Sequence, residues 1–102
     1  MEEALGVAAR LVAEGREAFI HDELLQYAAD TAISRLAECA RKLPEDVTAA
    51  IPSVPWPALM GMRNRLQHAS LDTDYALVWN VLASELPRVS DALRTYRNST
   101  DR

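Results

Sequence analysis

The dominant pattern in this sequence is the recurrence of apolar side chains every three or four residues, which is the spacing of one helix face. The first such stretch contains Leu5, Ala8, Val12, Gly15 and Phe19. No segment shows the sustained apolar–polar alternation with β-branched residues that is typical of strands. The pattern therefore predicts an all-α protein, an antiparallel up-down bundle of four to five helices.

Caps and helix breakers set the expected boundaries in the first half of the chain. We expect one helix over about residues 2–20 and then a break, after which the Asp22 side chain caps a second helix. Pro44 ends that helix, because proline has no amide proton and crowds the preceding turn. Residues 44–57 contain four of the five prolines and form the one long connection, with a short helical turn at 45–50.

The second half predicts two further helices. The third begins near Pro57 and ends at about residue 68. Asp72 or Thr73 caps the fourth, and Pro87 kinks or restarts it. Residues 98–102 are a polar tail that we expect to fray.

Length and composition exclude several classes of protein. A chain of 102 residues builds one core, so we expect residues 1–102 to form a single helical domain. The three glycines exclude a glycine-rich phosphate loop, and the single Cys39 excludes an intramolecular disulfide and a cysteine-based zinc site. We expect Cys39 to be a small buried hydrophobic residue, and we expect neither a cofactor nor a metal site. The acidic start and the short apolar runs favour a cytoplasmic protein without a membrane segment.

Charge is distributed unevenly along the chain. The net charge of −4 argues against broad, non-specific coating of nucleic acid. Residues 1–62 carry five basic and ten acidic side chains, whereas residues 63–102 carry six basic and five acidic ones. The acidity therefore belongs to the first part of the chain.

The most informative segment is 61–70, which reads Gly-Met-Arg-Asn-Arg-Leu-Gln-His-Ala-Ser. It is locally basic, with Arg63, Arg65 and His68, one of only two histidines, within six residues. It also lies at an expected helix end, beside the acidic turn that follows it. Arg63 and Asn64 followed by His68 fit the Arg-x4-6-His signature of HEPN-domain ribonucleases.

Ordered blocks on either side make this resemblance more specific. The chain resembles the HepT-like toxins of bacterial HepT–MntA toxin–antitoxin pairs from about residue 18 to 95. The matching blocks are Asp22-Glu23-Leu24, Val54-Pro55-Trp56, Gly61-Met62-Arg63-Asn64-Arg65, Asp72-Thr73-Asp74-Tyr75-Ala76-Leu77-Val78-Trp79 and Glu85-Leu86-Pro87. The resemblance implies a HEPN-like bundle acting as a homodimeric endoribonuclease toxin that needs no metal. It also implies RNA as substrate and a nucleotidyltransferase of the MNT type as antitoxin, with the homodimer forming part of a larger hetero-oligomer.

The residue types in this signature suit RNA cleavage through the ribose 2′-hydroxyl. A histidine such as His68 can take the 2′-hydroxyl proton or protonate the leaving 5′-oxygen. Arg63 stays charged and offers several donors to the phosphate oxygens, Asn64 supports the pair, and Arg65 is a candidate RNA contact. On a regular helix Arg63 and His68 lie roughly 140° apart around the axis, so they converge only if the helix unwinds near His68.

One position departs from the family pattern. The family motif continues as His-x-Tyr, and that tyrosine receives AMP from the antitoxin, but here the position is Ser70. Ser70 keeps a hydroxyl, and Tyr75 lies shortly after it, so both are candidate acceptors. The departure also supports an alternative function, a catalytically weak HEPN-like module that dimerises and docks a nucleotidyltransferase.

Other conspicuous side chains have simpler interpretations. His21 stands beside the Asp22 cap and is expected to be structural. Asp72 and Asp74 are more typical of helix caps than of a metal site. The large apolar side chains at helical spacing favour the core or a dimer interface, not a stacking platform for bases; they are Trp56, Met60, Met62, Tyr75 and Trp79.

Overall fold

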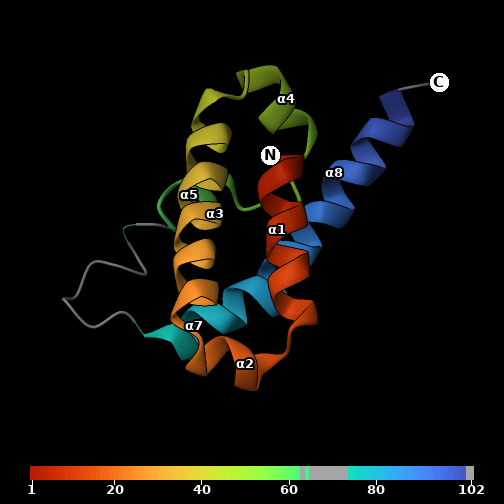
Figure 1. Cartoon of the computed structure of the whole chain (residues 1–102). Helices are drawn as coiled ribbons and strands as arrows, with labels where there is room; N and C mark the ends of the chain where they lie inside the picture. The colour runs from red at the N-terminus through yellow and green to blue at the C-terminus, as the bar shows by residue number, and fades with distance from the viewer. Residues whose placement is uncertain (63, 65–73, 101–102) are drawn as a thin grey trace.

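The structure is a computed structural model of the chain that describes residues 1–62, 64 and 74–100. Every regular element in these ranges is helical, which confirms the all-α prediction (Figure 1). The elements in chain order are α1 (Glu2–Ala13), α2 (Arg16–His21), α3 (Glu23–Lys42), α4 (Glu45–Ala50), α5 (Trp56–Met60), α7 (Tyr75–Asn80), the π-helical segment η1 (Val81–Glu85) and α8 (Leu86–Thr100).

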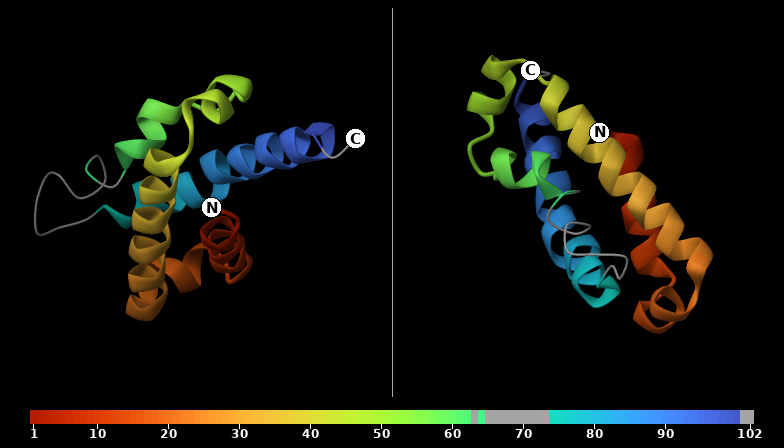
Figure 2. Two further views of the ribbon diagram at one scale, coloured as in Figure 1. Left: turned by 90° about the horizontal axis from the view of Figure 1, so that it is seen from above. Right: turned by 90° about the vertical axis from the view of Figure 1, so that its left-hand side faces the viewer.

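The long helix α3 organises the fold. It runs antiparallel to α1 and lies beside it, and it also contacts α2 and α5 (Figure 1). α7, η1 and α8 form one continuous helical path that passes α1 and ends away from α3 (Figure 2). The chain is elongated, with principal extents of 44 × 27 × 17 Å.

One hydrophobic core joins these helices. Its largest fully buried side chains come from α2, α3, α5, α7 and η1; they are Phe19, Leu36, Leu59, Val78, Val81 and Leu82. α1 adds Leu5, Ala8 and Leu11 to the same cluster. α5, the helix that leads into the Arg-x4-His segment, is therefore packed on the same core as α3.

The first helix is shorter than the sequence predicts, because the chain breaks at Gly15. Gly15 has φ 94° and ψ 154°, a conformation that is essentially restricted to glycine. α1 ends at Ala13, and α2 starts at Arg16 in a new direction. The expectation of one helix over 2–20 was wrong, because Phe19 returns to the common core and continues the apolar spacing across the break.

The expected start and end of the second helix are confirmed in α3. The Asp22 side chain accepts a hydrogen bond of 2.9 Å from the Leu24 N–H, which satisfies one of the free first-turn amides. The helix ends at Lys42, two residues before Pro44, and Pro44 then precedes the short helix α4. Cys39 is only half-buried on α3, so the expectation of a buried residue was wrong.

The fourth helix begins later than expected. The Asp74 side chain accepts hydrogen bonds from the N–H groups of Ala76 (3.1 Å) and Leu77 (3.3 Å), so Asp74 is the cap. The prediction of Asp72 or Thr73 was wrong, since the helix starts at Tyr75. The three candidate residues are adjacent and all have side chains that suit a cap.

The expected kink near Pro87 takes the form of a π-helical segment. The Leu86 N–H bonds to the Val81 carbonyl, five residues back, just before the ring of Pro87. This wider turn gives room to the proline, whose ring would crowd the carbonyl four residues earlier in a regular helix. α8 continues to Thr100, so residues 98–100 are helical where we expected the tail to fray. None of the described helices is long and apolar enough to cross a membrane.

Candidate functional site

The structure describes two of the six candidate site residues. Asn64 is helical with an exposed side chain, and Tyr75 is half-buried at the start of α7. Arg63, Arg65, His68 and Ser70 lie outside the described residues. The described residues therefore show the two stretches of chain that lead into and out of the Arg-x4-His segment.

α5 brings the chain into the segment from a buried position. Its first residue, Trp56, is buried and donates its indole N–H to the carbonyls of Thr48 and Ile51, both at 3.0 Å. Leu59 and Met62 continue into the core at 2% and 3% exposure. The predicted core role of Trp56 and Met62 is thus confirmed, and Asn64 follows as an exposed polar residue two positions later.

A second contact fixes the end of α5 on α3. The Arg41 guanidinium donates from Nη2 to the Met60 carbonyl oxygen at 3.0 Å. The same side chain lies 3.3 Å from a carboxylate oxygen of Glu38, one turn earlier on α3. The ion pair orients the guanidinium, and the guanidinium in turn satisfies a carbonyl at the end of a short helix.

The chain leaves the segment at Tyr75, whose side chain also contacts α3. Its hydroxyl donates a hydrogen bond of 3.0 Å to Oδ2 of Asp30. Its ring meets Phe19 of α2 edge-on, with centroids 6.0 Å apart and planes at 73°. Phe19 also contacts Trp79, at a centroid distance of 5.6 Å, so the start of α7 is seated on a small aromatic cluster.

Sequence reasoning missed Asp30 and Arg41. Both stand on exposed or half-buried faces of α3, 45 and 19 residues from the partners that they contact. The one available signal was Asp30 itself, a charged residue within the alanine-rich stretch 28–32 of a helix that otherwise packs on the core. Spacing along the chain does not reveal which distant element such a side chain meets.

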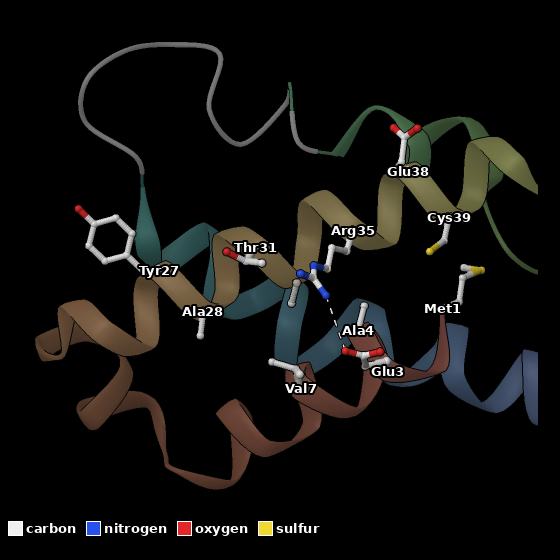
Figure 3. A pocket seen from close by; sticks show the side chains of 11 residues that line it. Met1, Glu3, Ala4, Val7, Tyr27, Ala28, Thr31, Arg35, Glu38 and Cys39 are labelled. Atoms are coloured by element: carbon white, nitrogen blue, oxygen red, sulfur yellow. Dashed lines mark ion pairs between the residues drawn. The ribbon is translucent and has the colours of Figure 1, made fainter.

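A groove runs between α1 and α3 on another part of the surface. Its volume is about 610 Å³, and an ion pair between Arg35 and Glu3 crosses it at 3.7 Å (Figure 3). Small side chains such as Ala28 and Thr31 form much of its wall, and Tyr27 stands at one end with 64% of its surface exposed. Leu24, one turn earlier on α3, is 78% exposed.

The described side chains do not form a metal centre. In residues 1–62, 64 and 74–100 no group of three or more His, Cys, Asp or Glu side chains is placed to hold a metal ion. His21 lies on the exposed end of α2, with its Nε2 atom 3.4 Å from Glu17.

Comparison with known proteins gives a family match over nearly the whole chain. A family model described as "Ribonuclease HepT-like" matches residues 1–96. Among similar curated proteins is "Putative RNase MJ1380" of Methanocaldococcus jannaschii, 31% identical over 71 residues, which are 70% of this chain and 65% of the relative. "Putative RNase MJ0125" of the same organism is 32% identical over 73 residues, 72% of this chain and 63% of the relative. "Probable ribonuclease HepT" of Thermococcus cleftensis is 26% identical over 81 residues, 79% of this chain and 74% of the relative.

Each of these alignments covers a larger share of this chain than of the relative. The chain spans only 60% to 65% of the length of three of its M. jannaschii relatives. No solved structure matches the chain significantly.

Proposed function

This chain belongs to the ribonuclease HepT-like family, and on that premise we propose that it is an endoribonuclease toxin that cleaves RNA without a metal. The observation that carries the proposal is the family match over residues 1–96, which encloses the Arg-x4-His signature of Arg63 and His68. Both residues lie outside the described part of the chain, so their roles rest on chemistry and on the family pattern.

In this mechanism the ribose 2′-hydroxyl attacks the adjacent phosphorus and displaces the 5′-oxygen, which leaves a 2′,3′-cyclic phosphate. His68 accepts the 2′-hydroxyl proton or donates a proton to the leaving oxygen, and Arg63 stabilises the charge on the phosphate oxygens. One chain supplies one suitable histidine, whereas a two-fold dimer would supply a second Arg–His pair. We therefore propose a homodimer with the RNA at its cleft. Asn64, exposed at the edge of the described segment, and Arg65 are proposed to support RNA binding.

Unpaired positive charge supports RNA binding at this end of the molecule. Arg94 and Arg97 of α8 are committed to ion pairs with Asp91 and Glu2. Arg88, by contrast, makes no ion pair within the described residues, and it lines a cavity of about 290 Å³ together with Met62. A cation placed beside the residue that precedes Arg63 suits a phosphate-bearing substrate.

We further propose that the toxin is paired with a nucleotidyltransferase antitoxin of the MNT type, acting in the cytoplasm. The large apolar side chains of Leu24 (78% exposed, on α3) and Leu77 (41% exposed, on α7) support a protein partner, because exposed apolar surface often marks an interface. Ser70 and Tyr75 are the candidate acceptors for AMP in place of the family tyrosine.

The test is RNA cleavage by the purified protein in EDTA, with analysis of the product ends. We expect cleavage that leaves cyclic phosphates, and we expect His68→Ala and Arg63→Ala to abolish it. His21→Ala is the matched control, since His21 is the other histidine of the chain and stands on an exposed helix end. Equal activity of wild type and His68→Ala, or loss of activity in EDTA, would contradict the proposal.

A second candidate function is a weakly active HEPN-like module that docks the nucleotidyltransferase. Ser70 at the position of the family tyrosine favours it, because the usual route of neutralisation is missing. It predicts co-purification with the nucleotidyltransferase and no growth arrest when the chain is expressed alone. Growth arrest that Arg63→Ala relieves would decide for the ribonuclease.

A further inference from the structure

We propose that α3 holds both ends of the Arg-x4-His segment through two positioning contacts, Arg41 to the Met60 carbonyl and Asp30 to the Tyr75 hydroxyl. The inference rests on the proposed ribonuclease function for its kinetic consequence. The contacts themselves lie wholly within the described residues, and they assign roles to three side chains outside the Arg-x4-His signature.

The contact before the segment is made by Arg41, whose guanidinium is oriented by an ion pair with Glu38. Arg41 reaches the Met60 carbonyl at 3.0 Å while it lies 3.3 Å from Glu38. Met60 is the last residue of α5, three positions before Arg63. A charge-assisted hydrogen bond at that carbonyl fixes where the chain leaves α5.

The contact after the segment is a hydrogen bond between side chains 45 residues apart in the sequence. The Tyr75 hydroxyl donates to Asp30 at 3.0 Å in a partly buried position, and Phe19 contacts the same ring edge-on. Tyr75 is the first residue of α7, seven positions after His68. The phenol is thus fixed at both its hydroxyl and its ring.

Both partners stand on one rigid element. Asp30 and Arg41 are eleven residues apart on α3, a rise of about 16 Å along the helix axis. The 14 residues between Met60 and Tyr75 must therefore span a separation that α3 fixes. This matters because Arg63 and His68 do not share a face of a regular helix, so their approach depends on how the segment is held at its ends.

This arrangement gives Tyr75 a role other than accepting AMP. Its hydroxyl is engaged by a carboxylate of the same chain, and its ring is packed against α2. Adenylylation would replace the hydroxyl proton and so remove the hydrogen bond to Asp30. Of the two candidate acceptors, Ser70 then remains the one proposed for modification.

The experiment compares Tyr75→Phe with Tyr27→Phe in the full chain. Tyr27 is the matched control, because it is 64% exposed on α3 and its hydroxyl makes no hydrogen bond within the described residues. Three quantities are measured: kcat and KM for a model RNA, the melting temperature, and hydrogen exchange of peptides covering residues 63–73. Arg41→Ala with Arg35→Ala as its control tests the other contact in the same way.

We expect Tyr75→Phe and Arg41→Ala to lower kcat by roughly 10- to 100-fold with KM unchanged, since small misplacements of reacting groups have effects of this size. We expect faster exchange in peptides 63–73 in both variants and in Asp30→Ala, but not in Tyr27→Phe or Arg35→Ala. Asp30→Asn keeps an acceptor oxygen and should restore the wild-type values.

The kinetic and exchange measurements separate this inference from the proposed function. If the wild type cleaves no RNA, the proposed function fails, and the exchange of peptides 63–73 alone decides whether the contacts hold the segment. Unchanged exchange in Tyr75→Phe would overturn the inference, as would a loss of kcat in Tyr27→Phe equal to that in Tyr75→Phe. Adenylylation of wild-type Tyr75 by the partner nucleotidyltransferase would also overturn it.

Discussion

Replacing Gly15 by alanine tests the break between α1 and α2. Gly15 has φ 94° and ψ 154°, where a Cβ atom is strained even though no other atom lies within 4 Å of its ideal position. A non-glycine residue held in such a region costs of order 1–3 kcal/mol. The strain is therefore a property of the backbone and not of crowding, so the surrounding side chains have no means to relieve it by moving.

The expected effect on unfolding follows from this cost. For a domain of this size each kcal/mol corresponds to a change in melting temperature of about 4–8 °C. We expect Gly15→Ala to melt roughly 4–24 °C below wild type in thermal unfolding followed by circular dichroism at 222 nm.

Gly6 provides the matched control, because it lies exposed inside α1, has an ordinary helical φ and has nothing within 4 Å of its ideal Cβ. The same substitution there should stabilise the protein by about 0.5–1 kcal/mol, since alanine forms helix more readily than glycine. Opposite signs for the two substitutions would support the structural argument.

If residues 2–20 formed one continuous helix, Gly15→Ala would stabilise the protein instead of destabilising it. In that case Gly15→Ala would raise both the helical signal and the melting temperature, as Gly6→Ala does. Such a result would refute the assigned break. It would also remove the support for Phe19 in its present position, where it contacts Tyr75 and Trp79.

Three further substitutions test individual contacts. Asp22→Ala removes the cap on the Leu24 N–H and should lower the free energy of unfolding by about 0.5–2 kcal/mol in urea titrations, whereas Asp22→Asn should retain most of it. Trp56→Phe removes the indole donor from two backbone carbonyls that keep their backbone donors, so we expect a loss of about 0.5–1.5 kcal/mol, measured in the same titrations; stability equal to wild type would contradict this role. Leu36→Ala, at a side chain only 1% exposed, should cost about 2–5 kcal/mol by differential scanning calorimetry, and a cost below 1 kcal/mol would contradict its place in the core.

The helices could be predicted where one local signal decided them. The boundaries of α3 follow from Asp22 and Pro44, because a capping carboxylate and a missing amide proton act on neighbouring backbone groups. The break at Gly15 was not predicted, because residues of two different helices share one core and so continue the same apolar spacing. Only Gly15 distinguished a broken helix from a continuous one, and a glycine does not by itself indicate a break, because Gly6 lies inside α1.

The candidate site could be predicted only as far as it is local in sequence. Arg63, Asn64 and His68 stand within six residues, so spacing alone brings them to attention. Asp30 and Arg41 have no such spacing, because their contacts depend on how α3 packs against α5 and α7. Contacts of this kind follow from the tertiary fold, and no pattern in a single sequence specifies them.

The charges of α8 show how the fold changes a conclusion drawn from composition. Residues 63–102 carry one more basic than acidic side chain, which by itself suggests a weakly positive surface along α8. In the structure Arg97 pairs with Glu2 of α1, and Arg94 pairs with Asp91, so the end of α8 offers little net charge to RNA. Arg88, near the start of α8 and beside Met62, has no such partner within the described residues. Among the described basic residues of α8, the one without an ion pair therefore lies beside Met62, next to the Arg-x4-His segment, and an acidic protein can bind phosphate there without binding RNA over its whole surface.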